Sequence, residues 1–142
     1  MRVHIRKLLV GFDESEPSRR ALALASDIAR QYGARIVLLS VLPPMPPVPL
    51  QLAPLSPGQR EIERVRSSLE REASAMRAEG LDVDVQVEIG DPVTTLGDFA
   101  DRLEIDVTVL GRSGKGAVAR ALLGSVTTGL LHSSSSPILI VP

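Results

Sequence analysis

The chain has 142 residues, which is the common size of one domain. Its 16 Lys and Arg residues stand against 17 Asp and Glu residues, and this balance excludes the strongly basic field of a nucleic-acid-binding protein. The absence of cysteine excludes disulfide scaffolds, thiol catalysis and cysteine-ligated zinc.

Apolar runs are too short for a membrane span, and the first residues lack the apolar core of a secretory signal. We therefore expect a cytoplasmic protein that folds as one domain over residues 1–142, with no nucleic-acid and no membrane partner.

Strand-like apolar runs alternate with longer helical patterns, which indicates an α/β domain with a mostly parallel sheet. The first strand is expected over Lys7–Phe12. A helix over 16–32 follows, with Ser15 as its cap and Gly33 as its left-handed exit. On this helix, the residues at helical spacing that we expect to face the sheet are Ala21, Leu24, Ala25 and Ile28.

A second strand is expected over residues 36–41. The proline-rich stretch at 43–57 carries no charge and is expected to form a surface loop, because proline fixes φ and removes a backbone donor. A ligand for another protein's groove is the alternative for this stretch. An amphipathic helix over 59–79 and a half-exposed edge strand over 83–89 come next.

Asp91 and Pro92 are typical of a helix start, and this helix is expected to reach about Leu103. The remaining expected elements are a fourth strand over 107–110, a short helix after Gly124 and a last strand over 138–141.

The fourth strand ends directly in the sequence GRSGKG at residues 111–116. Such glycines let backbone N–H groups point into one concavity. The helix after Gly124 opens with SVTT, which adds hydroxyls to its N–H donors and positive dipole end. No Asp or Glu follows Asp106, whereas Arg112, Lys115 and Arg120 do. Together these features predict an anion site.

Known glycine motifs fit this stretch poorly. In the P-loop pattern GxxxxGK[ST] the lysine precedes Ser or Thr, but Lys115 precedes Gly116. The loose dinucleotide pattern follows the fourth strand instead of the first and has no acidic residue downstream. The nucleophile pattern GxSxG fails because Lys115 stands where its second glycine belongs.

The spacing that fits is G-x2-G-x9-G-[ST], which Gly111, Gly114, Gly124 and Ser125 satisfy. Other shared features are VGFD at 10–13, GDP at 90–92 and the terminal PILIV at 137–141. With these motifs the sequence resembles the ATP-binding branch of the universal stress protein family over the whole chain.

The resemblance implies a Rossmann-like, adenine nucleotide alpha hydrolase-like fold: a five-stranded parallel sheet of order 3-2-1-4-5 with helices on both faces. Strands one and four are then neighbours whose connections leave in opposite directions, the switch point at which α/β sheets bind ligands. The resemblance also implies bound ATP, with Mg²⁺ helping to neutralise its phosphates. The residues implied for the nucleoside end are Gly11, Phe12, Asp13 and Val41; for the ribose and first phosphates, Leu110, Gly111, Ser113 and Gly114; and for the outer phosphates, Gly124, Ser125, Val126 and Thr127.

Glu14 departs from the family pattern, which often has glycine after the aspartate. A carboxylate near a triphosphate repels it unless the carboxylate points to solvent or reaches a bound metal.

The function that the resemblance implies is a dimeric regulatory module that binds ATP and passes its occupancy to an unidentified partner protein. The apolar last strand, which consists of Ile138, Leu139, Ile140 and Val141, would pair with its mate in a homodimer. One alternative is a slow ATPase or self-phosphorylating enzyme, although no carboxylate base follows Asp106. The other alternative is a nucleotide-free protein-interaction module. No catalytic residue and no metal ligand is assigned.

Overall fold

The computed structural model describes residues 4–44, 57–112 and 124–142. Its sheet is parallel and has the order β3-β2-β1-β4-β5, as the resemblance implied. The strands are β1 (Lys7–Gly11), β2 (Arg35–Leu42), β3 (Val83–Ile89), β4 (Val107–Gly111) and β5 (Ile138–Val141). The helices are α1 (Glu16–Tyr32), α2 (Pro57–Ala78), α3 (Pro92–Arg102) and α4 (Ser125–Ser133).

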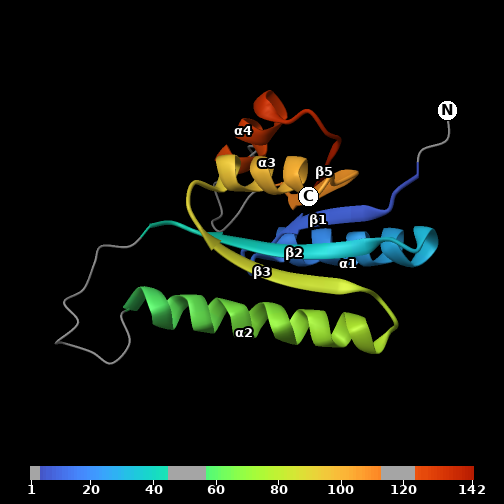
Figure 1. Cartoon of the computed structure of the whole chain (residues 1–142), viewed down its shortest axis with the longest axis horizontal. Coiled ribbons are helices and arrows are strands. Elements are labelled where there is room, and N and C mark those ends of the chain that lie inside the picture. The colour runs from blue at the N-terminus through green and yellow to red at the C-terminus, as the bar shows by residue number, and fades with distance from the viewer. Residues whose placement is uncertain (1–3, 45–56, 113–123) are drawn as a thin grey trace.

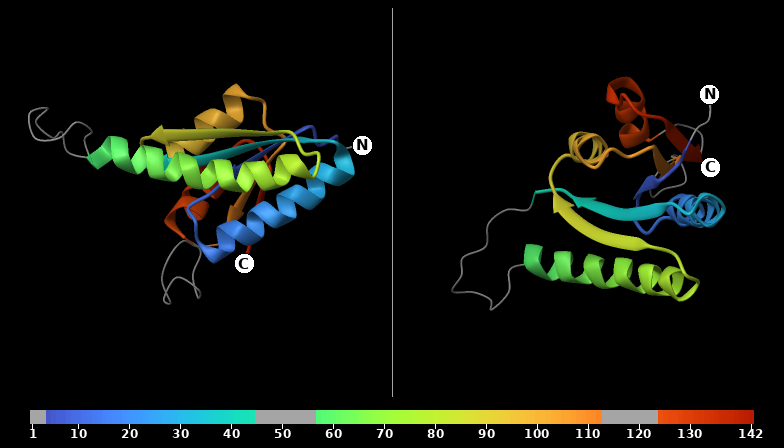
Figure 2. Two further views of the ribbon diagram at one scale, coloured as in Figure 1. Left: turned by 90° about the horizontal axis from the view of Figure 1, so that it is seen from below. Right: turned by 45° about the vertical axis from the view of Figure 1, so that its right-hand side comes forward.

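The helices cover the sheet in two layers, with α1 and α2 on one face and α3 and α4 on the other (Figures 1 and 2). Alternate residues of the central strands supply the two cores. Leu8 and Val10 of β1 point to the α1 and α2 side, whereas Leu9 points to the α3 and α4 side. A strand buried on both faces is apolar without interruption, which is why β1 shows no alternation in the sequence.

Helix α1 begins and ends as the sequence predicts. The Ser15 hydroxyl accepts a hydrogen bond from the Ser18 amide at 3.3 Å, and Gly33 adopts the left-handed conformation with φ 67°. The predicted buried face of α1 is wrong at Leu24, whose side chain is exposed. The sheet instead buries a stripe of mostly small residues, namely Ser18, Ala21, Leu22, Ala25, Ser26 and Ala29. Leu24 lies beside this stripe, whereas Leu22, a side chain of the same size, lies within it and is buried.

Helix α2 begins at Pro57, two residues before the expected start, with proline at a position where no amide donor is needed. The predicted amphipathic character of this helix is confirmed, because Val65, Leu69, Ala73 and Met76 at helical spacing are buried and Ile62 is partly buried. The predicted proline-rich loop falls largely on residues 45–56, which lie outside the described residues.

Candidate functional site

A cavity of about 320 Å³ opens at the carboxyl ends of β1 and β4. These strands pair with each other, yet the chain leaves them toward opposite faces, because α1 packs on one side and α4 on the other. The cavity therefore occupies the switch point of the sheet, where α/β folds bind ligands. Its volume lies at the small end of the range for ligand pockets, roughly 300–1,000 Å³.

Every predicted site residue that the structure describes lines this cavity. These residues are Gly11, Phe12, Asp13, Val41, Leu110, Gly111, Gly124, Ser125, Val126 and Thr127. The other two, Ser113 and Gly114, lie outside the described residues. The geometry thus brings together segments that are more than 100 residues apart in the chain, while the ligand contacts of each residue stay a prediction.

Five further lining residues were not predicted: Ser15, Ser18, Leu39, Pro92 and Leu96. Ser15 and Pro92 were interpreted only as helix-start residues. Their position at helix starts could have indicated a place in the site, because helices that follow parallel strands all begin at the carboxyl edge of the sheet. Three helix starts, those of α1, α3 and α4, consequently border the same cavity.

The start of α4 differs from the other two starts in its capping. Asp91 caps α3 and Ser15 caps α1, but Gly124 at the start of α4 provides no side-chain hydrogen bond. A helix start without a side-chain cap presents N–H donors and the positive end of the helix dipole. At α4 these donors belong to residues that line the cavity.

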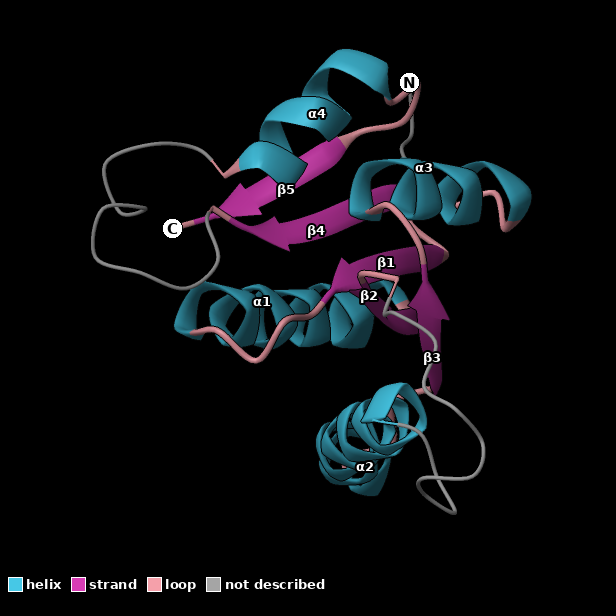
Figure 3. Ribbon diagram, turned by 90° about the vertical axis from the view of Figure 1, so that its left-hand side faces the viewer, coloured by secondary structure: helices cyan, strands magenta, loops and turns pink. Residues whose placement is uncertain are grey.

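Two hydrogen bonds fix the start of α4 to the residue that follows β4. The Gly124 amide donates to the Arg112 carbonyl oxygen at 2.9 Å, and the Thr127 hydroxyl donates to the same oxygen at 3.3 Å. Figure 3 shows α4 beginning at the edge toward which the arrowheads of β4 and β5 point. Residues 112 and 124 therefore meet.

Asp13 is the only charged residue among the described residues that line the cavity. One of its carboxylate oxygens, Oδ1, accepts hydrogen bonds from the amide of Ser15, at 3.0 Å, and from the Ser15 hydroxyl. The Ser40 hydroxyl donates to the carbonyl oxygen of the preceding residue, Phe12. The loop after β1 is thus tied to α1 and to β2.

Glu14 is not among the residues that line the cavity. Its carboxylate binds the guanidinium of Arg64 on α2, with both oxygen–nitrogen distances at 3.1 Å. Arg64 also binds Glu61, and these carboxylates, Glu61 first and then Glu14, raise the pKa of Arg64 above its usual value.

In the part of the chain that the structure describes, no three His, Cys, Asp or Glu residues gather as a metal site would require. No described helix combines the length and apolar character needed to cross a membrane.

The universal stress protein family model matches residues 4–142 of the chain. Universal stress protein Sll1654 of Synechocystis is 26% identical over 99% of this chain and 87% of that protein. A universal stress protein solved in complex with cAMP is 27% identical, covers 97% of each chain and has a TM-score of 0.70. Universal stress protein UspA of Lactobacillus plantarum, at 22% identity, covers 99% of this chain and 100% of its own, with a TM-score of 0.76, and shares the fold.

Proposed function

Because the chain belongs to the universal stress protein family, we propose that it binds an adenine nucleotide in the cavity between β1 and β4. The observation that carries this proposal is the start of α4, which offers N–H donors without a side-chain cap at the wall of a cavity at the switch point. The relative solved with cAMP supports the same class of ligand.

The lining of the cavity supports an orientation for the nucleotide. Leu39 and Val41 of β2 offer apolar surface to the base, next to Asp13, whose Oδ2 would accept hydrogen bonds from ribose hydroxyls. The phosphates would then extend past Gly111 toward Ser125. There, the amide and hydroxyl donors at the start of α4 would bind the negatively charged phosphate oxygens. Ser113 and Gly114 complete this phosphate end in the proposal.

ATP is the proposed nucleotide, with Mg²⁺ as its counter-ion. Mg²⁺ in nucleotide sites is held largely by phosphate oxygens and water, with one or two protein carboxylates. The one carboxylate among the described lining residues, that of Asp13, lies at the proposed ribose end, so phosphate oxygens and water would supply the Mg²⁺ ligands at the phosphate end.

The proposed role is regulatory: a homodimer whose occupancy by ATP is recognised by another protein. Support for the dimer comes from β5, which pairs with β4 and forms the edge of the sheet among the described strands. Its four residues are all apolar and only partly buried, and an edge of this kind is normally paired or covered. We place the protein in the cytoplasm.

The test has two steps. One sample of freshly purified protein is denatured, and the nucleotides that it releases are identified. A second, folded sample is then titrated calorimetrically with Mg-ATP, AMP and cAMP. Ser125→Val adds a branched apolar side chain at the phosphate end and is expected to weaken binding of ATP most, because ATP has the most phosphates. Thr128→Val is the matched control, since Thr128 lies on the same helix, is exposed and does not line the cavity.

Equal binding of ATP by the Ser125→Val and Thr128→Val variants would reject the proposed phosphate end. Titrations that are flat with all three nucleotides, on a protein that releases none, would favour the nucleotide-free interaction module instead.

A further inference from the structure

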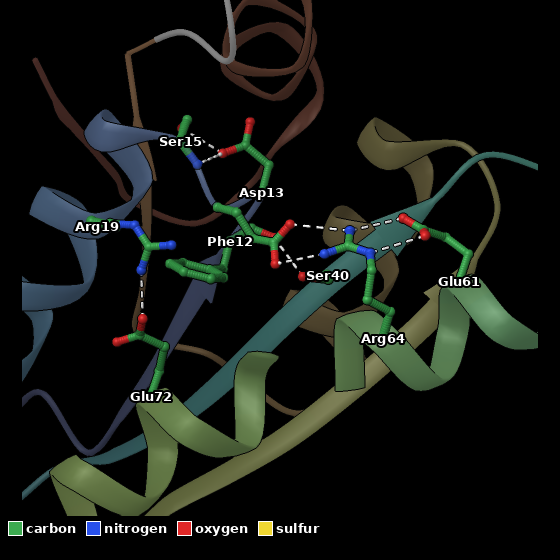
Figure 4. Close-up of polar contacts among 9 residues, drawn as sticks. Phe12, Asp13, Ser15, Arg19, Ser40, Glu61, Arg64 and Glu72 are labelled. Atoms are coloured by element: carbon green, nitrogen blue, oxygen red, sulfur yellow. Dashed lines mark hydrogen bonds and ion pairs between the residues drawn. The ribbon is translucent and has the colours of Figure 1, made fainter. Parts of the chain in front are cut away.

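Helix α2 is joined by two arginine–glutamate pairs to the segment that walls the cavity (Figure 4). Arg19 of α1 binds Glu72 at 2.5 Å, while Arg64 of α2 binds Glu14 through two contacts of 3.1 Å. Helix α2 does not itself line the cavity. The pair of Arg64 with Glu14 joins α2 directly to the loop after β1, whose neighbouring residues line the cavity.

Glu14 adopts a backbone conformation that side chains rarely take, with φ at 66°. Glycine enters this left-handed region without steric cost, but a residue with a Cβ keeps it only when its surroundings hold it there. The surroundings of Glu14 include the guanidinium of Arg64, whose planar fork fixes a carboxylate in direction as well as distance. Glu61 holds the same guanidinium from its other side, at 2.9 and 3.0 Å.

Glu14 lies between the two residues whose hydrogen bond fixes the Asp13 side chain. The Ser15 amide donates to Oδ1 of Asp13, so Glu14 is the central residue of a turn closed by that hydrogen bond. Asp13 and Ser15 line the cavity, whereas Glu14 does not. In Figure 4, Asp13 extends away from Arg64, on the opposite side of the loop. Rotation of the backbone at Glu14 would swing Asp13 relative to the rest of the cavity wall.

We propose that Arg64 is a positioning residue of the nucleotide site: by clamping Glu14 in its left-handed conformation, it holds the Asp13 carboxylate toward the ligand. The ligand in this inference rests on the proposed function, whereas the contacts among Arg64, Glu14 and Asp13 do not depend on it. Glycine at position 14 would need no clamp, since the turn would form without strain. With glutamate at position 14, the ion pair with Arg64 on α2 holds the left-handed conformation that glycine would adopt without strain.

The test compares Arg64→Met in three backgrounds by titration with Mg-ATP. With Glu14 present, Arg64→Met is expected to raise the dissociation constant about tenfold, because the binding-competent loop falls to a minor fraction of the population. The double variant Arg64→Met with Glu14→Gln has lost the charge but keeps the Cβ, so it is expected to bind as weakly as Arg64→Met alone. In the Glu14→Gly background Arg64→Met changes the dissociation constant less than about twofold, since no strain needs to be held.

Equal rescue by Glu14→Gln and Glu14→Gly would overturn the proposal, because it would show that Arg64 acts only by neutralising a charge. Unchanged affinity in Arg64→Met with Glu14 present would overturn it as well. Arg77→Met is the matched control. Arg77 lies on the same helix, but it pairs with Glu70 and donates to the Val83 carbonyl oxygen, and neither residue belongs to the loop after β1. Its affinity should equal that of the wild type.

A second readout needs no nucleotide. Hydrogen exchange at the Ser15 amide reports the bond to Asp13 directly. Exchange should accelerate in the Arg64→Met variant and in Arg64→Met combined with Glu14→Gln, but stay slow when Arg64→Met is combined with Glu14→Gly. If the wild type binds no nucleotide, the proposed function fails while this exchange pattern still decides whether Arg64 positions Asp13.

Discussion

Gly111 at the end of β4 lies directly against Pro17 in the first turn of α1. A Cβ built on Gly111 would stand 2.6 Å from the Pro17 carbonyl carbon and 2.7 Å from the Ser18 amide nitrogen. Backbone atoms cannot give way as the end of a flexible side chain can. Glycine at this position is therefore required by the close approach of helix and strand, independently of any ligand.

Gly111→Ala should lower the free energy of unfolding by about 1–3 kcal/mol, since the added methyl group forces α1 away from β4. Chemical denaturation measures the change. Gly97→Ala is the control: a Cβ there meets nothing within 4 Å, so alanine inside α3 should be neutral or stabilise by up to about 1 kcal/mol. Comparable losses in the two variants would contradict this account.

Gly129 brings α4 against α3 in a similar way, because a Cβ there would lie 2.7 Å from Cγ2 of Val93. Gly129→Ala alone should destabilise the fold by about 1–3 kcal/mol. Shortening the opposing side chain with Val93→Ala should recover part of that loss in the double variant. A double-mutant cycle followed by denaturation measures the coupling, and purely additive effects would show that the two helices do not compete for this space.

Asp91 predicts an acid-dependent contribution to stability. Its carboxylate accepts a hydrogen bond from the Thr94 amide at 2.9 Å, and this bond lowers the pKa of Asp91. A lowered pKa means that the stabilisation is complete above the ordinary carboxyl pKa of about 3.9 and is lost as the pH falls through the lowered value. The stability difference between wild type and Asp91→Ala should shrink over that acid range.

Denaturant titrations between neutral pH and about pH 3 measure this difference. Asp98→Ala is the control, because it removes an exposed carboxylate from the same helix that does not cap the helix start. A pH-independent difference for Asp91→Ala would argue against a charge-dependent cap.

Ile140→Lys tests the proposed dimer. Leu139 and Val141 pack against one core and Ile138 against the other, whereas Ile140 joins neither, so a lysine there should spare the fold. Sedimentation should then show a monomer for Ile140→Lys. Ile89→Lys, at a residue 53% exposed on the opposite edge strand, should leave the dimer intact. A dimer that persists in Ile140→Lys would place the interface elsewhere.

Local patterns predicted most of the fold, because they arise from neighbouring residues. Ser15 and Asp91 act as caps within three residues of their own positions, and the burial of β1 on both faces makes its apolar run continuous. The buried face of α1 was missed at Leu24 for a tertiary reason. Hydrophobicity along a helix does not by itself say which of its residues the sheet contacts, and here Leu24 lies beside the buried stripe.

The sequence alone determined the order of elements, their caps and the glycine spacing from 111 to 124, since each depends on residues close together in the chain. Only the tertiary structure decided which residues meet at the cavity and what Glu14 does. Its partner Arg64 lies 50 positions away on α2, which the packing of that helix on the sheet brings beside the loop. The left-handed conformation of Glu14 cannot be predicted from neighbouring residues in the sequence, because the residue that holds it, Arg64, is distant in the chain.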